Sequence, residues 1–194
     1  MRHVVRVIAH WALLTHIYVS MAGFTLALLF AVTGLTLNHG DFGWSDPQVT
    51  KSEITVDKTL VDNPDQATLD AWLRAKLRLT SPSTDYHDDP DQIQITFAVP
   101  GGRTVVNINR ADGRADVEKE SRGIVGKLND LHKGLDSGKV WFWTIDVAGV
   151  FLVVSSLTGM VTLIALRARR YTGFTIGILG ILTVLAIYLL CVPK

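Results

Sequence analysis

Cysteine is nearly absent from this sequence, and charged residues are nearly absent from three long parts of it. The only cysteine is Cys191, which excludes a disulfide within the chain. The charge-poor stretches are residues 11–37, 140–166 and 173–192, and Asp146 is the only charged residue in them. Each stretch reaches the roughly 20 apolar residues that a helix needs to cross a bilayer. The sequence therefore predicts a membrane protein with three transmembrane helices.

The first stretch does not have the pattern of a cleavable secretory signal. Signal peptides have a hydrophobic region of only about 7–15 residues, followed by a small-residue cleavage site. Residues 11–37 form a longer run, and no clear A-x-A site precedes Asn38. We therefore expect the first stretch to remain as a transmembrane helix.

Arginines flank the apolar stretches on one side of the predicted membrane. Arg2 and Arg6 precede the first stretch, and three more follow the second: Arg167, Arg169 and Arg170. Lys and Arg gather on the cytoplasmic side of membrane helices. The N-terminus and the turn at 167–170 are therefore expected in the cytoplasm, which leaves residues 38–139 outside.

The expected domains are a transmembrane helix at 1–39, an extracytoplasmic domain at 40–139, a second helix at 140–166, and a turn with a third helix at 167–194. From Gly40 to Lys139 there are 17 acidic and 13 basic residues. This mildly acidic balance argues against nucleic acid as a partner, because nucleic acid selects for basic surfaces. Membrane lipid is the partner that the composition predicts.

Periodicity predicts a mixed fold for the extracytoplasmic domain. Helical spacing of apolar residues indicates an amphipathic helix, and alternation of apolar and polar residues indicates strands. The predicted fold class is therefore α+β. The expected order is an extended arm with a short strand at 40–64, a helix at 65–79, a loop at 81–91, a hairpin of strands 92–99 and 103–113 with a bulge or longer loop, a third strand at 114–122, and a helix from Gly123 to about Gly134.

Motifs of common enzyme classes are absent from this domain. It has no G-x-S-x-G, no H-E-x-x-H, no nucleophilic cysteine and no phosphate-binding loop. His87 lies among Asp85, Asp88, Asp89 and Asp91, a set that could hold a metal ion weakly. A hydrated acidic loop is the favoured interpretation of this stretch.

Histidines are concentrated in and beside the apolar stretches. His10 and His16 lie near the start of the first stretch, His39 follows its end, and His132 precedes the second stretch. The 23 residues from His16 to His39 would span about 35 Å in a helix, so these two mark opposite sides of the bilayer. His39 and His132 belong to the same outer layer and could meet.

Two neutral imidazoles from different helices at one depth suit the iron of a low-spin haem. Haem between helices also needs small residues, and four glycines would serve: Gly23, Gly34, Gly149 and Gly159. The alternative is that the histidines are hydrated at the interface and that the glycines serve helix packing. Spacing alone leaves both interpretations open.

Asp146 is the only charge inside an apolar stretch, and its expected depth is similar to that of Asn38 and His39. It could accept the second N–H of a ligand histidine, as carboxylates beside metal sites do. Capping of a backbone group or contact with water is the alternative. Asn38 and Asp146 are therefore candidates to orient a ligand histidine. The nearby tryptophans fit an interfacial aromatic belt: Trp44, Trp141 and Trp143.

A short sequence motif, called the Thr-Gly echo below, occurs in both of the first two apolar stretches. AVTGLTL at 31–37 and SLTGMVTL at 156–163 share Thr-Gly, then apolar residues, then Thr-Leu. The two copies belong to helices that are expected to run in opposite directions. An inverted relation and coincidence are both compatible with one short echo.

Three segments in and beside the predicted helices are distinctive: AVTGLTLNHGDF at 31–42, LNDLHKGLDSGKVWFWTIDVAGVFLVVSSLTG at 128–159 and RARRYTGF at 167–174. Between them, residues 94–123 read QITFAVPGGRTVVNINRADGRADVEKESRG, which is similar to a PepSY module. Together they resemble the small PepSY-associated transmembrane proteins of bacteria. The resemblance covers nearly the whole chain. It implies the bacterial inner membrane as the location, with residues 38–139 in the periplasm.

Larger PepSY transmembrane relatives look like reductases of ferric siderophores that carry b-type haem between helix histidines. The resemblance therefore implies haem b here, held by His39 and His132 on the outer side and by His10 or His16 on the inner side. With three helices and one PepSY module, the chain is smaller than those relatives. A homodimer or a redox partner subunit would then complete the path of the electron.

The predicted function is that of a haem-binding electron-transfer subunit, which supports periplasmic metal or ferric-siderophore reduction as part of a membrane oxidoreductase. The alternative is a non-redox, membrane-anchored interaction module. Such a module would bind a partner through a strand edge or through the domain face around Phe97, Val105 and Ile108.

Overall fold

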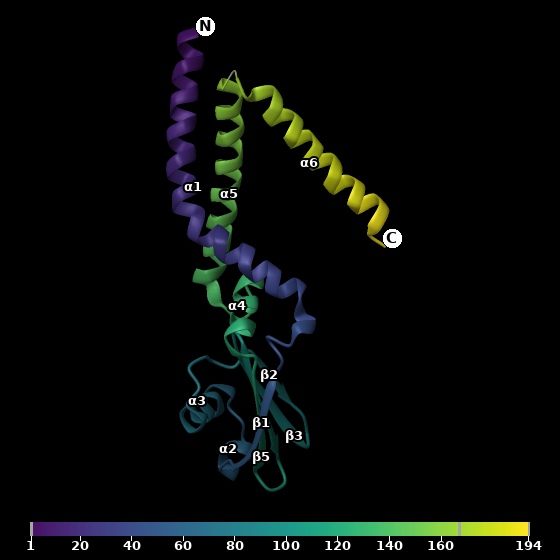
Figure 1. Ribbon diagram of the computed structural model, residues 1–194. Helices are drawn as coiled ribbons and strands as arrows, with labels where there is room; N and C mark the ends of the chain where they lie inside the picture. The colour runs from purple at the N-terminus through teal and green to yellow at the C-terminus, as the bar shows by residue number, and fades with distance from the viewer. Residues whose placement is uncertain (1, 167, 194) are drawn as a thin grey trace. The chain divides into compact units, whose positions relative to one another are not determined.

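The computed structural model describes residues 2–166 and 168–193. The chain divides into two compact units. The helical unit comprises Met1–Leu28 and Asp146–Lys194, and the sheet unit comprises Leu29–Ile145. Figure 1 shows that the helical unit is built of long helices and that the sheet unit contains all the strands.

Within the described residues, three helices are long and apolar enough to cross a membrane, as the sequence predicts. They are α1 (Arg2–Asn38), α5 (Gly138–Ala165) and α6 (Arg170–Cys191). Within the helical unit, α1 and α5 come close at Gly23, where an added Cβ would lie 3.0 Å from Cβ of Phe151. Small residues let membrane helices approach in this way. The three helices are those of a multi-pass membrane protein.

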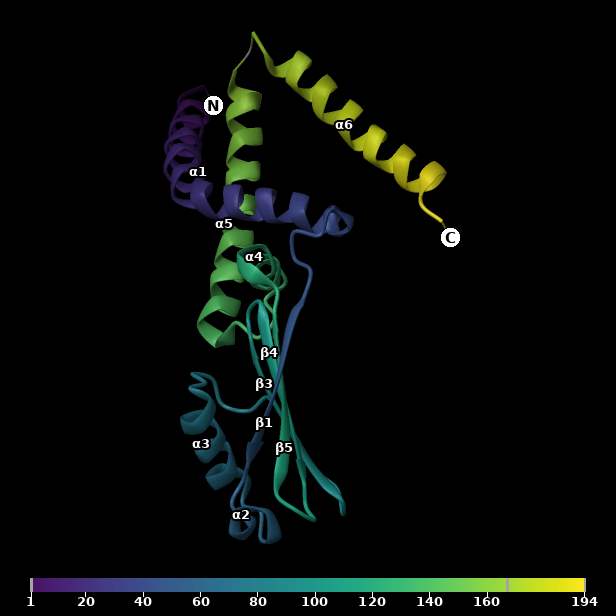
Figure 2. The same ribbon diagram turned by 60° about the horizontal axis from the view of Figure 1, so that its bottom comes forward.

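The sheet unit contains one five-stranded antiparallel sheet, with the strand order β1-β5-β4-β3-β2 (Figure 2). The predicted α+β class is therefore confirmed. The strands are β1 (Gln48–Thr55), β2 (Asp85–Asp88), β3 (Gln92–Val99), β4 (Gly102–Asn109) and β5 (Arg114–Ser121). The helices are α2 (Lys58–Asp62), α3 (Gln66–Leu77) and α4 (Gly123–Lys133), besides a short 3-10 helix, η1 (Gly40–Phe42).

Two elements differ from the sequence-based expectation. The predicted loop at 81–91 contains β2, because Tyr86 packs against the core and pairs with Ile95. Aspartates on either side hide this strand from a sequence reading, since aspartate is depleted in strands. The expected arm also contains α2, whose N-cap Asp57 accepts a hydrogen bond from the Thr59 N–H.

The β3–β4 hairpin closes through a two-residue turn, and the expected bulge or longer loop is wrong. Val99 pairs with Gly102, so only Pro100 and Gly101 lie between the strands. Proline favours the first central position of a turn, and Gly101 supplies a φ of +77° at the second. This is the φ pattern of a type II turn.

The core lies between one face of the sheet and the helices α2 and α3. Leu69 and Leu73 of α3 pack against buried residues of the central strands: Ile93, Ile95, Phe97, Val106, Ile108, Ala115 and Val117. Side chains alternate between the faces of a strand, so Val105 lies on the face opposite to Phe97 and Ile108. The predicted interaction face around these three residues is therefore wrong, because two of them belong to the core.

Helix α4 is fixed to the β3–β4 turn by Asp130, whose relative exposure is 1%. Its carboxylate accepts a hydrogen bond from the Gly101 N–H at 2.8 Å and forms an ion pair with Arg122 at 3.0 Å. The backbone N–H of Arg122 in turn donates a hydrogen bond to the Gly101 carbonyl at 2.8 Å. A buried charge is tolerated only with such partners. The contact therefore gives α4 a defined position on the sheet.

We expect Gly101→Ala to destabilise the protein more than Gly123→Ala. Both glycines have positive φ, +77° and +62°, which costs another residue about 1–2 kcal/mol. At Gly101 an added Cβ would also lie 2.7 Å from the Lys127 backbone, whereas at Gly123 nothing lies within 4 Å. That overpacking adds about 1–3 kcal/mol. Thermal unfolding of the full chain in detergent measures the difference, and equal losses of Tm would contradict the packing of α4 on the turn.

Candidate functional site

His132 lies in the last turn of α4 and contacts the C-terminal part of α1 within the sheet unit. Its Nδ1 lies 2.6 Å from Oγ1 of Thr33, and its ring meets the Phe30 ring edge-on with centroids 5.0 Å apart. A Cβ added at Gly34 would lie 3.7 Å from Cε1 of His132. The imidazole is therefore held against a neighbouring helix.

The hydroxyl of Thr33 determines which nitrogen of His132 carries the hydrogen. Thr33 donates its hydroxyl hydrogen to the Leu29 carbonyl at 2.7 Å, so its oxygen accepts from His132. On this hydrogen-bond network, Nδ1 of His132 carries the hydrogen and Nε2 keeps its lone pair. Neutral imidazole in this form can bind a metal through Nε2.

His16 has the same arrangement inside the helical unit. Its Nδ1 lies 2.9 Å from the Ser155 carbonyl, which can only accept, so Nδ1 is again the donor and Nε2 keeps its lone pair. Oγ1 of Thr158 is 3.4 Å from the same nitrogen and donates to the Val154 carbonyl at 2.7 Å. A Cβ added at Gly159 would lie 3.1 Å from the imidazole, which is closer than most Cβ contacts, so the glycine lets the ring lie close to the helix.

The two histidines contact the two copies of the Thr-Gly echo. The pair at 33–34 receives His132, and the pair at 158–159 receives His16. In both copies the threonine hydroxyl donates to the carbonyl four residues earlier, and the glycine lies beside the imidazole. The two copies therefore share their local contacts, and an inverted relation between the stretches stays a prediction.

His39 follows the last residue of α1 and stacks on Phe42, with ring centroids 5.0 Å apart and planes 7° apart. In the described part of the sheet unit, no hydrogen bond or ring contact joins His39 to His132. His132 contacts α1 at Thr33. Thr33 precedes His39 by six residues, which span about 9 Å along a helix. A shared site for the two histidines stays a prediction, and so does a role for the exposed Asn38.

His10 and Asp146 are less constrained than His16. Both side chains are exposed, and the His10 ring meets the Trp11 ring edge-on at a centroid distance of 6.2 Å. Asp146 belongs to the helical unit, whereas His132 belongs to the sheet unit. The expected bond from a ligand histidine to Asp146 therefore stays a prediction.

The bonds that hold α4 beside α1 and α5 involve residues that the sequence did not single out for this role. Thr36 donates to Oδ1 of Asn129 at 2.6 Å, and Nε1 of Trp141 donates to the Leu131 carbonyl at 2.7 Å. Trp141 is therefore more than a member of an aromatic belt. The echo contains Thr36, but nothing in the sequence points to Asn129.

The acidic stretch around His87 belongs to an edge strand with paired side chains. Nε2 of His87 lies 3.1 Å from Oδ2 of Asp85, and Asp88 forms an ion pair with Arg110. Within residues 2–166 and 168–193, no group of three potential metal ligands occurs. The geometry therefore gives no support to a metal site in this stretch.

Residues 6–193 match the family described as "Putative PepSY_TM-like". No curated protein and no solved structure shows significant similarity to the chain. The matched region includes the sheet, both histidine contacts and all three apolar helices, so the resemblance inferred from the sequence is confirmed. The chain therefore belongs to the PepSY_TM-like family of membrane proteins.

Proposed function

We propose that the protein is a haem b-binding electron-transfer subunit of a membrane oxidoreductase, with His132 and His16 as axial ligands on opposite sides of the membrane. The observation that carries this proposal is the Nδ1 hydrogen bond of each imidazole, which leaves Nε2 available to iron. His39 and His10 are the candidates for the second ligand in each layer. The hydrogen bond of His16 favours it over the exposed His10 as the first inner ligand.

The residues around each imidazole fit such a role. A bound haem would supply one-electron transfer, at a potential set by its ligands and their hydrogen bonds. Thr33 and the Ser155 carbonyl would fix the orientation of the two ligand rings and increase the basicity of Nε2. Gly34 and Gly159 keep the space beside the rings free of side chains.

The proposed location is the bacterial inner membrane, with the N-terminus in the cytoplasm and residues 38–139 in the periplasm. Arg6 lies near the start of α1. Arg169 lies between α5 and α6, and Arg170 is the first residue of α6. Arg167, which belongs to the same predicted cluster, lies outside the described residues. These charges support the orientation because Lys and Arg remain on the cytoplasmic side.

A partner would complete the electron path. Low-spin haem takes two axial ligands, and each unit holds one histidine whose Nδ1 is hydrogen-bonded. The second ligand in a layer would come from His39 or His10 of the same chain, from a second copy in a homodimer, or from a redox partner subunit. In the proposed orientation, electrons would leave toward a metal or ferric-siderophore substrate in the periplasm.

A non-redox interaction module is the second candidate function. One of the two edge strands, β1, is exposed at every position except Ile54, which is half-buried. An exposed strand edge can pair with an extended segment of another protein. This function differs from the first in predicting a purified protein without haem absorbance.

We expect His132→Ala to reduce the haem content of the purified protein, because iron would lose one axial ligand. The matched control is His87→Ala, which removes an exposed histidine of β2 and should leave the haem content unchanged. Haem per protein is measured from the absorbance of the pyridine adduct. Added imidazole should restore the reduced spectrum of His132→Ala, which separates a lost ligand from a lost fold. Unchanged haem content and spectrum in His132→Ala would refute the ligand assignment.

We expect Thr33→Val to weaken haem binding by about 10–100-fold, because the isosteric change removes the oxygen that accepts from Nδ1 of His132. Thr25→Val is the matched control on the same helix, since Thr25 is exposed and lies eight residues before Thr33. Haem titration of the haem-depleted proteins measures both affinities. Equal affinities for the two variants would show that the Thr33 hydroxyl does not support the ligand.

A further inference from the structure

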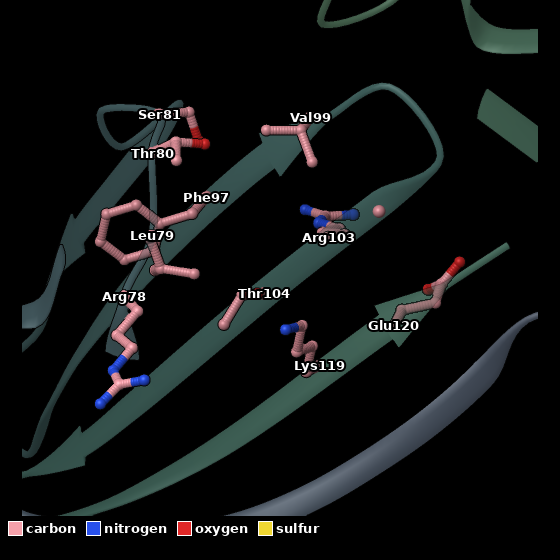
Figure 3. Close-up of a pocket in the computed structure, with 11 residues that line it drawn as sticks. Arg78, Leu79, Thr80, Ser81, Phe97, Val99, Arg103, Thr104, Lys119 and Glu120 are labelled. Carbon is pink, nitrogen blue, oxygen red and sulfur yellow. The ribbon is translucent and has the colours of Figure 1, made fainter. Parts of the chain in front are cut away.

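A small pocket lies between the end of α3 and the strands β3, β4 and β5, and two cationic side chains flank it, those of Arg78 and Lys119 (Figure 3). Arg78 follows the last residue of α3, and Lys119 of β5 pairs with Thr104 on the face of the sheet that carries Phe97. Arg103 of β4 belongs to the pocket lining, but its side chain lies on the opposite face, because side chains alternate along a strand. Hydroxyl groups complete the polar lining: Thr80, Ser81 and Thr104. The pocket is therefore rich in hydrogen-bond donors from separate elements of the sheet unit.

The two cations of this pocket, Arg78 and Lys119, differ from most arginines of the sheet unit in having no carboxylate partner among the residues that the structure describes. Of six arginines in the unit, four form ion pairs with carboxylates: Arg74, Arg110, Arg114 and Arg122. Arg78 and Arg103 are the remaining two, and within the described residues neither they nor Lys119 form an ion pair. Like charges gathered in one place repel one another, and a bound anion removes that repulsion.

The one carboxylate at the pocket, that of Glu120, has another partner. Its Oε1 lies 3.3 Å from Nε of Arg122, outside the pocket lining. Figure 3 shows the Glu120 side chain pointing away from Lys119. The pocket therefore keeps a net positive charge.

Asp70 holds the segment that carries Arg78. Its carboxylate forms an ion pair with Arg74 at 2.7 Å and accepts a hydrogen bond from the Ser83 N–H at 2.6 Å, so it fixes the chain on both sides of residues 78–81. Burial acts to raise the pKa of Asp70, but the contacts with Ser83 and Arg74 outweigh burial and lower it. Asp70 is therefore charged at neutral pH. Arg78 itself has a φ of +55°, a conformation that is uncommon outside glycine.

The size and floor of the pocket indicate the kind of anion. Its volume is about 180 Å³, below the roughly 300–1,000 Å³ of sites for drug-sized ligands. Apolar side chains line it beside the cations: Leu79, Phe97 and Val99. A hydrated inorganic anion makes no use of an apolar floor, whereas an anionic group on a short apolar stem does.

We propose that this pocket binds the carboxylate of a small organic acid. Arg78 and Lys119 supply the charge-assisted hydrogen bonds, which are stronger than neutral ones. Leu79, Phe97 and Val99 contact the apolar stem. The site is separate from the proposed haem ligand, because His132 contacts Thr33 and Phe30 and neither of these residues lines the pocket.

The test uses the full-length, ¹⁵N-labelled protein in detergent and follows backbone amide chemical shifts. Benzoate is the carboxylate probe, and phosphate is the comparison anion at the same ionic strength. We expect saturable shifts with benzoate at Gly102, Thr104 and Lys119, and weaker binding of phosphate. Equal or tighter binding of phosphate would overturn the assignment to an organic carboxylate.

A pair of double variants tests the residues. Arg78→Gln with Lys119→Gln should weaken benzoate binding at least about tenfold, because it removes two charged donors. The control, Lys76→Gln with Lys127→Gln, removes the same charge from the same unit outside the pocket and should keep the wild-type affinity. The amide spectra report whether each variant is folded. Equal weakening in both variants, or shifts that do not saturate in the wild type, would overturn the proposal.

Discussion

The position of His132 depends on one buried carboxylate, that of Asp130. This residue lies two positions before His132 on α4, accepts from the Gly101 N–H of the hairpin turn, and pairs with Arg122. Because the charge is buried, moving α4 off the turn would leave it without partners at a large cost in free energy. Asn129 and His132 of the same helix then bond to α1. The sheet therefore positions the histidine through α4.

The protonation pattern of the two imidazoles connects structure to the proposed chemistry. An imidazole beside a helix can donate to a threonine hydroxyl or to a backbone carbonyl that faces it. Thr33 provides a hydroxyl acceptor for His132, and Ser155 of α5 provides a carbonyl acceptor for His16. Both solutions place the hydrogen on Nδ1. The clearance beside the two rings differs: an added Cβ would lie 3.1 Å from the imidazole at Gly159 and 3.7 Å from it at Gly34, so only the His16 contact is tight.

Hydropathy and alternation predicted the three apolar helices, the β3–β4 hairpin and β5, because each depends on a local pattern of apolar residues. β2 was not predicted, because Asp85–Asp88 becomes a strand only when Tyr86 reaches a core assembled from distant segments. In the candidate site, the histidines could be predicted from the sequence because they lie in or beside apolar stretches. The bond from His132 to Thr33 could not be predicted, since it joins residues 99 positions apart and periodicity does not reveal which helix faces meet.

The most direct test of the central claim is an optical spectrum of the full-length protein, purified in detergent after expression with an adequate supply of haem. The spectrum is measured first in the oxidised state and then after reduction with dithionite. If the histidines ligate haem b, we expect a Soret band and, on reduction, the sharp α and β bands of a low-spin haem. A folded preparation without haem absorbance in either state would contradict the proposed function and leave the interaction module in its place.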